Sequence, residues 1–181
     1  MAGRKETYVA LLRGINLGAR NKIAMTRLRE LFEAAGAEDV STYVQSGNVV
    51  FRSTAPAGEL EERIAARIKQ DLELDVTVLV RSRKQIAKTV SGNPFATRNA
   101  DPKALHVTFL AAKPPAARVR VLGPSPSPPD DFRVVGRDVY LSCPNGYGRS
   151  KLSNAYFEKG LGVAATTRNW RTVTTLAEMA S

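Results

Sequence analysis

The order of strand-like and helix-like patterns constrains the fold of this chain more than any other feature of its sequence. Short runs of β-branched and aromatic residues alternate in its first half with stretches whose apolar residues recur every three or four positions. The predicted strands lie at 8–12, 40–44, 48–51 and 76–80, and the predicted helices at 25–35 and 60–72. This β-α-β-β-α-β order is typical of a ferredoxin-like α+β fold, in which helices cover one face of an antiparallel sheet.

The second half of the chain repeats this order less clearly. The predicted strands lie at 104–110, 132–135 and 139–142, and the predicted helices at 114–121, 150–159 and 167–180. The fold class that follows is α+β, with two tandem ferredoxin-like subdomains and an extra C-terminal helix.

Domain boundaries follow from the same pattern. An additional helix and a loop separate the two repeats and are expected to link them. We therefore expect an N-terminal subdomain at 1–82, a linking helix and loop at 83–102, and a C-terminal subdomain with the C-terminal helix at 103–181.

Bulk composition excludes several classes of protein. Hydrophobic residues make up 43% of the chain and charged residues 24%, and no apolar stretch approaches the roughly 20 residues of a membrane-spanning helix. The charged N-terminus is followed by only five apolar residues before Arg13, so we expect no secretory signal and a cytoplasmic protein. One cysteine, Cys143, and one histidine, His106, rule out a multi-cysteine zinc site and most histidine-based sites. We expect neither a metal nor a cofactor.

The charge balance favours a partner that carries phosphate. Lysine and arginine number 27 against 17 aspartate and glutamate residues, a formal net charge of +10. Such an excess attracts phosphate groups over long range and gains free energy when counterions are released. The alternative is that the charge only keeps the protein in solution.

Polar residues follow the first predicted strand and fill the turn of the predicted hairpin. The first strand runs up, its helix returns, and the second strand runs up beside the first, so these segments should meet at one sheet edge. The candidate ligand-binding residues in them are Arg13, Asn16, Asn21, Lys22, Gln45, Ser46 and Asn48. The alternative is that the asparagines and glycines only satisfy the geometry of the turns.

A glycine-rich segment at 145–151 supplies a second group of candidates. It holds Tyr147, Arg149 and Lys151 just before a predicted helix, whose free amide groups make a plausible seat for an anion. The spacing does not match a Walker loop. The alternative is a glycine turn capped by Ser150, with solvated cations. Arg168 lies at the predicted start of the last helix, where it could reach an anion or pair with an acid.

Several of these segments resemble one bacterial family. They are 8–16, 45–51, 145–148, 151–154 and 167–170, and together they resemble the family called domain of unknown function 1697. The resemblance implies a duplicated ferredoxin-like fold in a bacterial cytoplasmic protein. It implies no activity and no catalytic residue. Asn154 and Asn169, which lie within these segments, complete the candidate ligand-binding residues.

The leading hypothesis is a module that binds nucleic acid or a phosphorylated small molecule through these basic loops. Base stacking on the sheet is disfavoured, because 49–51 lacks the RNP1 pattern. One alternative is an enzyme acting on a nucleotide-like or phosphorylated substrate, with Lys151 or Tyr147 near the reacting group. No histidine, cysteine or carboxylate in the sequence accompanies those two residues to tune a proton transfer. Another alternative is a homo-oligomeric interaction protein whose basic loops are incidental.

Overall fold

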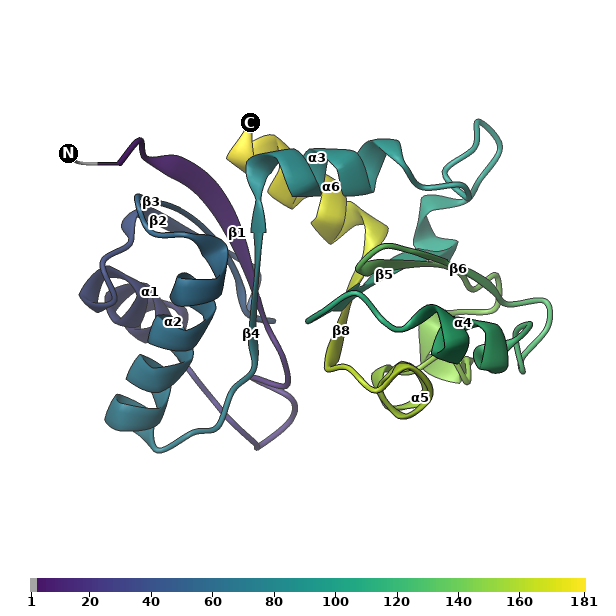
Figure 1. Cartoon of the computed structure of the whole chain (residues 1–181), viewed down its shortest axis with the longest axis horizontal. Coiled ribbons are helices and arrows are strands. Elements are labelled where there is room, and N and C mark those ends of the chain that lie inside the picture. Colours follow the sequence, from purple (N-terminus) through teal and green to yellow (C-terminus); the bar gives the residue numbers. More distant parts are fainter. Residues whose placement is uncertain (1–2) are drawn as a thin grey trace. The chain divides into compact units, whose positions relative to one another are not determined.

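Two four-stranded antiparallel sheets, each with helices, make up the computed structural model, which describes residues 3–181 (Figure 1). The chain divides into two compact units. Unit 1 contains the residues up to Lys88 together with Thr175–Ser181, and unit 2 contains Thr89–Thr174. Within residues 3–181, no helix combines the length and the apolar character that crossing a bilayer requires.

Unit 1 has the predicted ferredoxin-like order of elements. These are β1 (Glu6–Leu12), α1 (Met25–Ala34), β2 (Glu38–Tyr43), β3 (Asn48–Ser53), α2 (Ala57–Leu72) and β4 (Val78–Ser82). The strands lie in the order β2-β3-β1-β4. The prediction that the first two strands lie beside each other is wrong, because β3 pairs with both and separates them. β1 and β2 still run in the same direction, so their ends reach the same edge of the sheet.

The core of unit 1 lies between the sheet and its two helices. Leu28 and Phe32 of α1 and Ile64 of α2 are fully buried against it. The Phe51 ring of β3 meets the Phe32 ring edge-to-face, with centroids 5.3 Å apart, and the Tyr8 ring of β1 at 5.8 Å. Each such side chain stabilises the fold by roughly 1.5–3 kcal/mol through burial.

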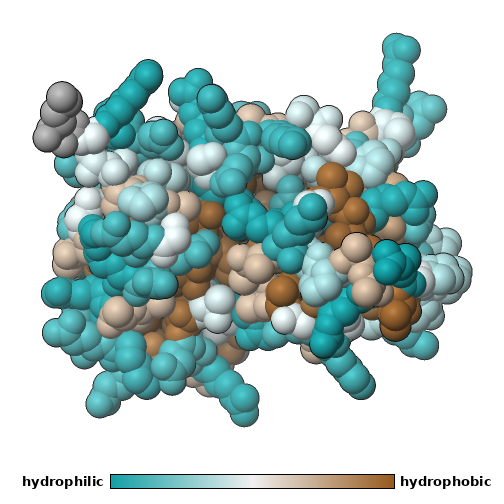
Figure 2. All heavy atoms as spheres, in the orientation of Figure 1, coloured by the Kyte–Doolittle hydropathy of each residue, from teal (hydrophilic) through white to brown (hydrophobic). Residues whose placement is uncertain are grey.

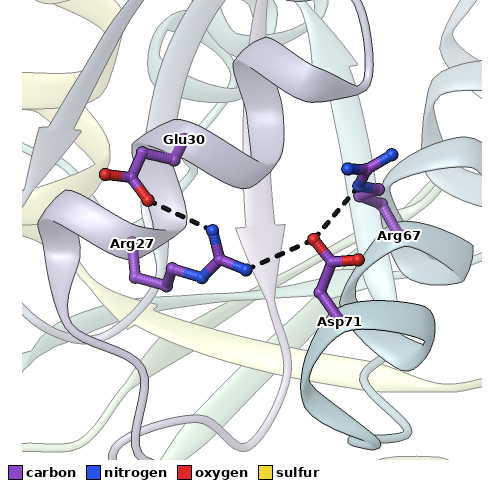
Figure 3. Close-up of polar contacts among 4 residues, drawn as sticks. All are labelled: Arg27, Glu30, Arg67 and Asp71. Atoms are coloured by element: carbon purple, nitrogen blue, oxygen red, sulfur yellow. Dashed lines mark hydrogen bonds and ion pairs between the residues drawn. The ribbon is translucent and has the colours of Figure 1, made fainter.

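An ionic network joins α1 to α2 on their outer surface (Figure 3). The carboxylate of Asp71 accepts from Arg27 of α1 at 3.3 Å and from Arg67 of its own helix at 3.2 Å. Arg27 also pairs with Glu30 at 3.1 Å. The side chain of Asp71 is 18% exposed, whereas that of Glu30 is 61% exposed, so Asp71 is the better shielded centre of the network.

Unit 2 repeats the sheet of unit 1. Its strands are β5 (Leu105–Leu110), β6 (Asp131–Val135), β7 (Asp138–Ser142) and β8 (Ala165–Asn169), in the order β6-β7-β5-β8. Its helices are α4 (Ala116–Leu122) and α5 (Asn154–Leu161), with 3₁₀ turns η1 (Pro102–Ala104) and η2 (Tyr147–Arg149). Two further helices, α3 (Arg83–Ser91) and α6 (Trp170–Ala180), cross the unit boundaries, and α6 is the predicted C-terminal helix. The predicted duplication is confirmed.

Two predicted helices, α5 and α6, begin three or four residues later than the sequence indicated. α5 starts at Asn154, because Ser153 caps it by accepting from the backbone N–H of Tyr156 at 3.2 Å. The segment 165–169 is not helical but forms β8, the fourth strand of the sheet, which pairs with β5. Its two threonines favour a strand. α6 therefore starts at Trp170 rather than at Thr167.

The network between α1 and α2 predicts that Asp71 matters more for stability than Glu30. Asp71→Ala leaves Arg27 and Arg67 side by side without their shared carboxylate, and we expect it to lower the free energy of unfolding by about 1 kcal/mol. Glu30→Ala is the control, because it removes only the exposed partner of Arg27, and we expect a loss below about 0.5 kcal/mol. Urea denaturation measures both values. Equal losses would contradict this assignment.

Candidate functional site

The loop after β1 and the turn between β2 and β3 lie at one edge of the sheet, as predicted. The backbone N–H of Leu12 donates to Gly47 O at 2.9 Å. Gly47 has φ 83°, and a Cβ there would lie 2.9 Å from side-chain atoms of both Leu12 and Ile15. Only glycine allows this approach of the turn to the end of β1. We call residues 13–22 and 44–48 together the unit 1 loop site.

Asn16 ties the two segments of the unit 1 loop site together. Its Nδ2 donates to Gln45 O at 2.7 Å and to Ile23 O at 3.0 Å. Its Oδ1 accepts from the backbone N–H of Ile23 at 2.8 Å. Both amide protons are thereby used by the fold, and the residue has φ 53°, in the left-handed region that asparagine tolerates.

Two further asparagines of the site also bond to the backbone. Asn21 donates to Gly14 O at 3.1 Å. Asn48 is fully buried and donates to Tyr43 O at 3.0 Å and to the Ser46 hydroxyl at 2.9 Å. The three asparagines therefore shape the loops, as the alternative interpretation of the sequence held.

Cations and apolar side chains cover the outer surface of the unit 1 loop site. Lys22 and Gln45 are exposed and Arg13 is half-buried. Arg20, which the sequence patterns did not indicate, is exposed at a turn where its backbone N–H donates to Leu17 O at 3.2 Å. Leu17, with an exposed fraction of 67%, was not indicated either. No acidic residue occurs at 7–29 or 40–58, and that gap in the charge pattern was the available signal.

Val44 combines strain with exposure in the same turn. It has φ 50°, in the left-handed region where a β-branched residue is an outlier, and its exposed fraction is 52%. Neighbouring bonds hold this conformation, since Gln45 O accepts from Asn16 and Tyr43 O accepts from Asn48. Backbone strain of this kind tends to concentrate at binding surfaces.

In unit 2, the glycine-rich segment packs over the end of β5. The ring of Tyr147 stacks on that of His106, with centroids 4.8 Å apart and planes 24° apart. His106 Nδ1 is buried and makes no hydrogen bond within the described residues. Burial lowers the pKa of His106, which keeps the imidazole neutral near pH 7. Burial also raises the pKa of Tyr147, while a hydrogen bond with Thr167 works in the opposite direction.

A chain of hydroxyl groups holds Asn154 in place. Thr167 Oγ1 donates to Asn154 Oδ1 at 2.6 Å and lies 2.7 Å from Thr108 Oγ1. Ser153 caps α5 by accepting from the backbone N–H of Tyr156, so that N–H is not free for an anion near Arg149 and Lys151. Ser150 caps no α-helix, and its hydroxyl instead accepts from the backbone N–H of Leu152 at 3.1 Å.

Arg149 and Lys151 project into solvent. Both side chains are exposed, and neither forms an ion pair or a side-chain hydrogen bond with another of residues 3–181.

Arg168 differs from these two cations, because it is only 8% exposed and donates to Thr166 Oγ1 at 2.7 Å and Thr167 O at 3.0 Å. Burial lowers the pKa of Arg168 to about 10. Asn169 Oδ1 accepts from the backbone N–H of Thr172 at 2.8 Å, at the start of α6.

Cys143 and Asp138 are two further reactive groups of unit 2. Cys143 is fully buried, and burial raises the pKa of its thiol, as expected for an inert cysteine. Asp138 accepts from the hydroxyl of Thr89 at 2.7 Å. Among residues 3–181, no three histidine, cysteine or carboxylate side chains gather in a way that could hold a metal ion.

The central strands of both sheets are buried on both faces. In β1, Val9 and Leu11 are fully buried although they alternate with the residues that face the helices. In β5, Val107 and Phe109 are likewise fully buried. Neither strand offers bases an exposed aromatic platform, in agreement with the missing RNP1 pattern.

The excess positive charge lies mostly in unit 2. Residues 89–174 contain twelve lysine and arginine residues against five aspartate and glutamate residues. Nine of the twelve form no ion pair with another of residues 3–181: Arg98, Lys103, Lys113, Arg118, Arg120, Arg149, Lys151, Lys159 and Arg171. In unit 1, by contrast, Arg27, Arg63 and Arg67 are paired with acids.

Comparisons with known proteins show a family and a fold. A family described as "Protein of unknown function (DUF1697)" matches residues 5–140. The chain is similar to the conserved bacterial protein SP0830 from Streptococcus pneumoniae, with a TM-score of 0.78 and 20% identity. The similarity covers 98% of this chain and 100% of that one. No curated protein matches the sequence.

The bonds of Asn16 predict a large effect of a nearly isosteric substitution. Asn16→Asp replaces the Nδ2 donor by an oxygen and leaves the carbonyl groups of Ile23 and Gln45 facing it. We expect a loss of roughly 2 kcal/mol in the free energy of unfolding, measured by urea denaturation. Asn21→Asp removes only one donated bond and should cost about half as much. A smaller loss for Asn16→Asp than for Asn21→Asp would contradict the role of Asn16.

The strain at Val44 predicts a stabilising substitution. Val44→Asn places a residue that tolerates left-handed backbone at this position, and we expect the free energy of unfolding to rise by about 1 kcal/mol. Val135→Asn is the matched control, because Val135 is also 52% exposed but lies in the extended strand β6, where asparagine is unfavourable. Thermal and urea unfolding test both variants. A Val44→Asn protein no more stable than the parent would show that the turn carries no strain.

Proposed function

We propose that this chain, which belongs to the DUF1697 family of proteins of unknown function, binds nucleic acid through the phosphate backbone. The observation that carries the proposal is the set of exposed, unpaired cations in unit 2, above all Arg149 and Lys151. A cation without an acidic partner does not have to break an ion pair before it binds a phosphate. Its contact with the backbone releases counterions, which favours binding.

The aromatic and amide groups around these cations suit a flexible strand. Tyr147 precedes both cations in the chain and is half-buried, with its ring stacked on that of His106 of β5. Asn154 is held by Thr167, so it gives the segment a fixed base. Arg168 and Asn169 stabilise the end of β8 and the start of α6, and we assign them a supporting role.

The unit 1 loop site is the second proposed contact. Arg13, Arg20 and Lys22 provide its positive charge, and the exposed side chain of Gln45 provides a hydrogen-bonding group. Three asparagines and Ser46 hold the two segments rigid, which lowers the entropy lost when a partner binds. Phosphate contacts of this kind position a nucleic acid without reading its sequence.

The surface is less suited to a small phosphorylated molecule. Such ligands are usually enclosed in concave pockets with a few convergent polar groups. The cavities of about 350–610 Å³ between α1 and α2, between α4 and α5, and at two other places within unit 1 are lined by none of the candidate ligand-binding residues. Arg63 and Arg67, which line one of them, are both held in ion pairs. An extended chain of phosphates matches dispersed cations better than a single phosphate does.

We also infer that the protein acts in the cytoplasm, where nucleic acids are accessible. One buried, unpaired cysteine suits a reducing compartment. The family resemblance points to the same compartment, and the basic surface would meet polyanions there.

Salt dependence tests the proposal. We expect a fluorescein-labelled DNA strand of roughly 20 nucleotides, longer than a typical binding site, to bind with an affinity that falls steeply with added salt. Arg149→Ala combined with Lys151→Ala should weaken binding and lower the slope of log K against log salt by about 1 for each cation removed. Lys22→Ala tests the unit 1 loop site in the same assay. Fluorescence anisotropy over a salt series gives both quantities.

The control and the contradicting outcomes are specific. Lys5→Ala removes one charge from an ion pair with Glu38 at 2.6 Å, and we expect little change in affinity or slope. Affinity that stays constant from low to high salt would exclude backbone binding. Saturable thermal stabilisation by a mononucleotide, unaffected by Arg149→Ala, would point instead to a small phosphorylated ligand.

A further inference from the structure

A groove between α4 and α5 exposes apolar surface outside the unit 1 loop site and the glycine-rich segment at 145–151. It has a volume of about 610 Å³ and lies within unit 2. The two helices contact each other along one face of the second sheet (Figure 1). Figure 2 shows hydrophobic side chains reaching the surface where Figure 1 places α4, with hydrophilic ones around them.

The floor of the groove is built by close helix packing. Gly160 of α5 lets α4 approach, since a Cβ at this position would lie 2.5 Å from Leu122 Cδ1. Leu122 and Tyr156 are half-buried, and Val121 beside them has an exposed fraction of 87%. A valine this exposed gains nothing from the fold of the unit, so its burial is available to a partner.

Only cations provide charge around this floor. Arg118 of α4 and Lys159 of α5 line the groove from its two helices, and no carboxylate lines it. Neither cation forms an ion pair with another of residues 3–181. The guanidinium of Arg118 lies over Gly162 at the end of α5, where a Cβ would be 3.1 Å from it. An apolar floor with a cation on each side is complementary to an apolar stripe bordered by acids.

We propose that this groove binds an acidic amphipathic helix of a partner protein. The helices that form it contain seven and eight residues, which corresponds to about 10–12 Å of length. Such a groove takes roughly two turns of a partner helix, whose side chains at i, i+3 or i+4, and i+7 would cover Val121 and Leu122. Glutamate or aspartate on both sides of that stripe would reach Arg118 and Lys159.

A second copy of this chain fits the groove poorly. The most acidic helix among residues 3–181 is α2, but Leu60, Ile64 and Ile68 on its apolar side are fully buried in the core of unit 1. Two of its acids, Glu59 and Asp71, are already paired with arginines. A nucleic acid would use the cations but not the exposed valine. The apolar floor therefore favours a protein helix.

A designed peptide tests the proposal on the full-length protein. The probe is a fluorescein-labelled peptide of about fifteen residues, roughly four helical turns, with leucine at helical spacing and glutamate at most other positions. We expect saturable binding by fluorescence anisotropy. Val121→Ser should weaken it roughly fivefold through lost apolar burial, and Lys159→Glu roughly tenfold through charge repulsion. Because Val121 is almost fully exposed, its replacement should leave the melting temperature unchanged.

Matched controls separate the groove from general surface effects. Val135→Ser changes another exposed valine and Lys103→Glu another unpaired lysine, and both should bind the peptide as the parent does. A peptide of the same composition without helical spacing, and one with glutamine in place of glutamate, should bind far more weakly. The proposal would be overturned if either control peptide bound as tightly as the original peptide, or if Val121→Ser did not weaken peptide binding.

Two further outcomes would also overturn it. One is the absence of saturable binding up to about 1 mM peptide, beyond the range of a specific interface. The other is a change of oligomeric state in Val121→Ser, measured by light scattering, which would make a second copy the occupant of the groove. This proposal does not rest on the proposed binding of nucleic acid. Val121→Ser should therefore bind the labelled DNA strand as the parent does.

Discussion

Burial of the central strands on both faces is the constraint on which the rest of this structure depends. β1 and β5 each pair with a strand on either side, and Leu11 and Phe109 show that their apolar residues are buried on the face away from the helices too. A strand in that position can present neither its edges nor its faces to a ligand. Chemistry at the surface is left to the loops at the strand ends and to the outer faces of the helices.

The loop and the turn of the unit 1 loop site are held in place because their polar side chains form hydrogen bonds with the backbone. Asn16 closes the unit 1 loop site through three hydrogen bonds, and Asn48 holds its turn from a fully buried position. From the sequence, these asparagines were predicted to contact a ligand. Residue type alone does not distinguish an asparagine that shapes a loop from one that binds a partner. The structure separates them by their partners: the asparagines bond inward, whereas Lys22 and Gln45 face outward.

Local patterns were enough to predict most of the fold. Unit 1 was predictable because its apolar periodicities are strong and its turns are marked by glycine, as at Gly47. β8 was not, because a five-residue strand of Ala165–Asn169 leads directly into α6 and carries no turn residue between the two. The prediction that β1 and β2 are adjacent was wrong. Strand order depends on long-range pairing, and β3 pairs with both β1 and β2.

The candidate sites were predictable only in part, and for a physical reason. The positions of Arg13 and Gln45 at one edge follow from topology, but whether a cation is paired depends on contacts that no local pattern encodes. Arg67 and Arg149 are both arginines near glycine or alanine in the sequence, yet one is held by Asp71 and the other is unpaired. Exposed apolar residues were missed for the same reason, since Val121 occupies a helical position that could equally have been buried.

Unit 2 thus combines surplus cations with two different neighbours, Tyr147 at the loop and Val121 at the groove. On the two proposals above, the neighbouring group rather than the charge distinguishes the partners, because a phosphate backbone needs only cations and an acidic helix also needs an apolar floor.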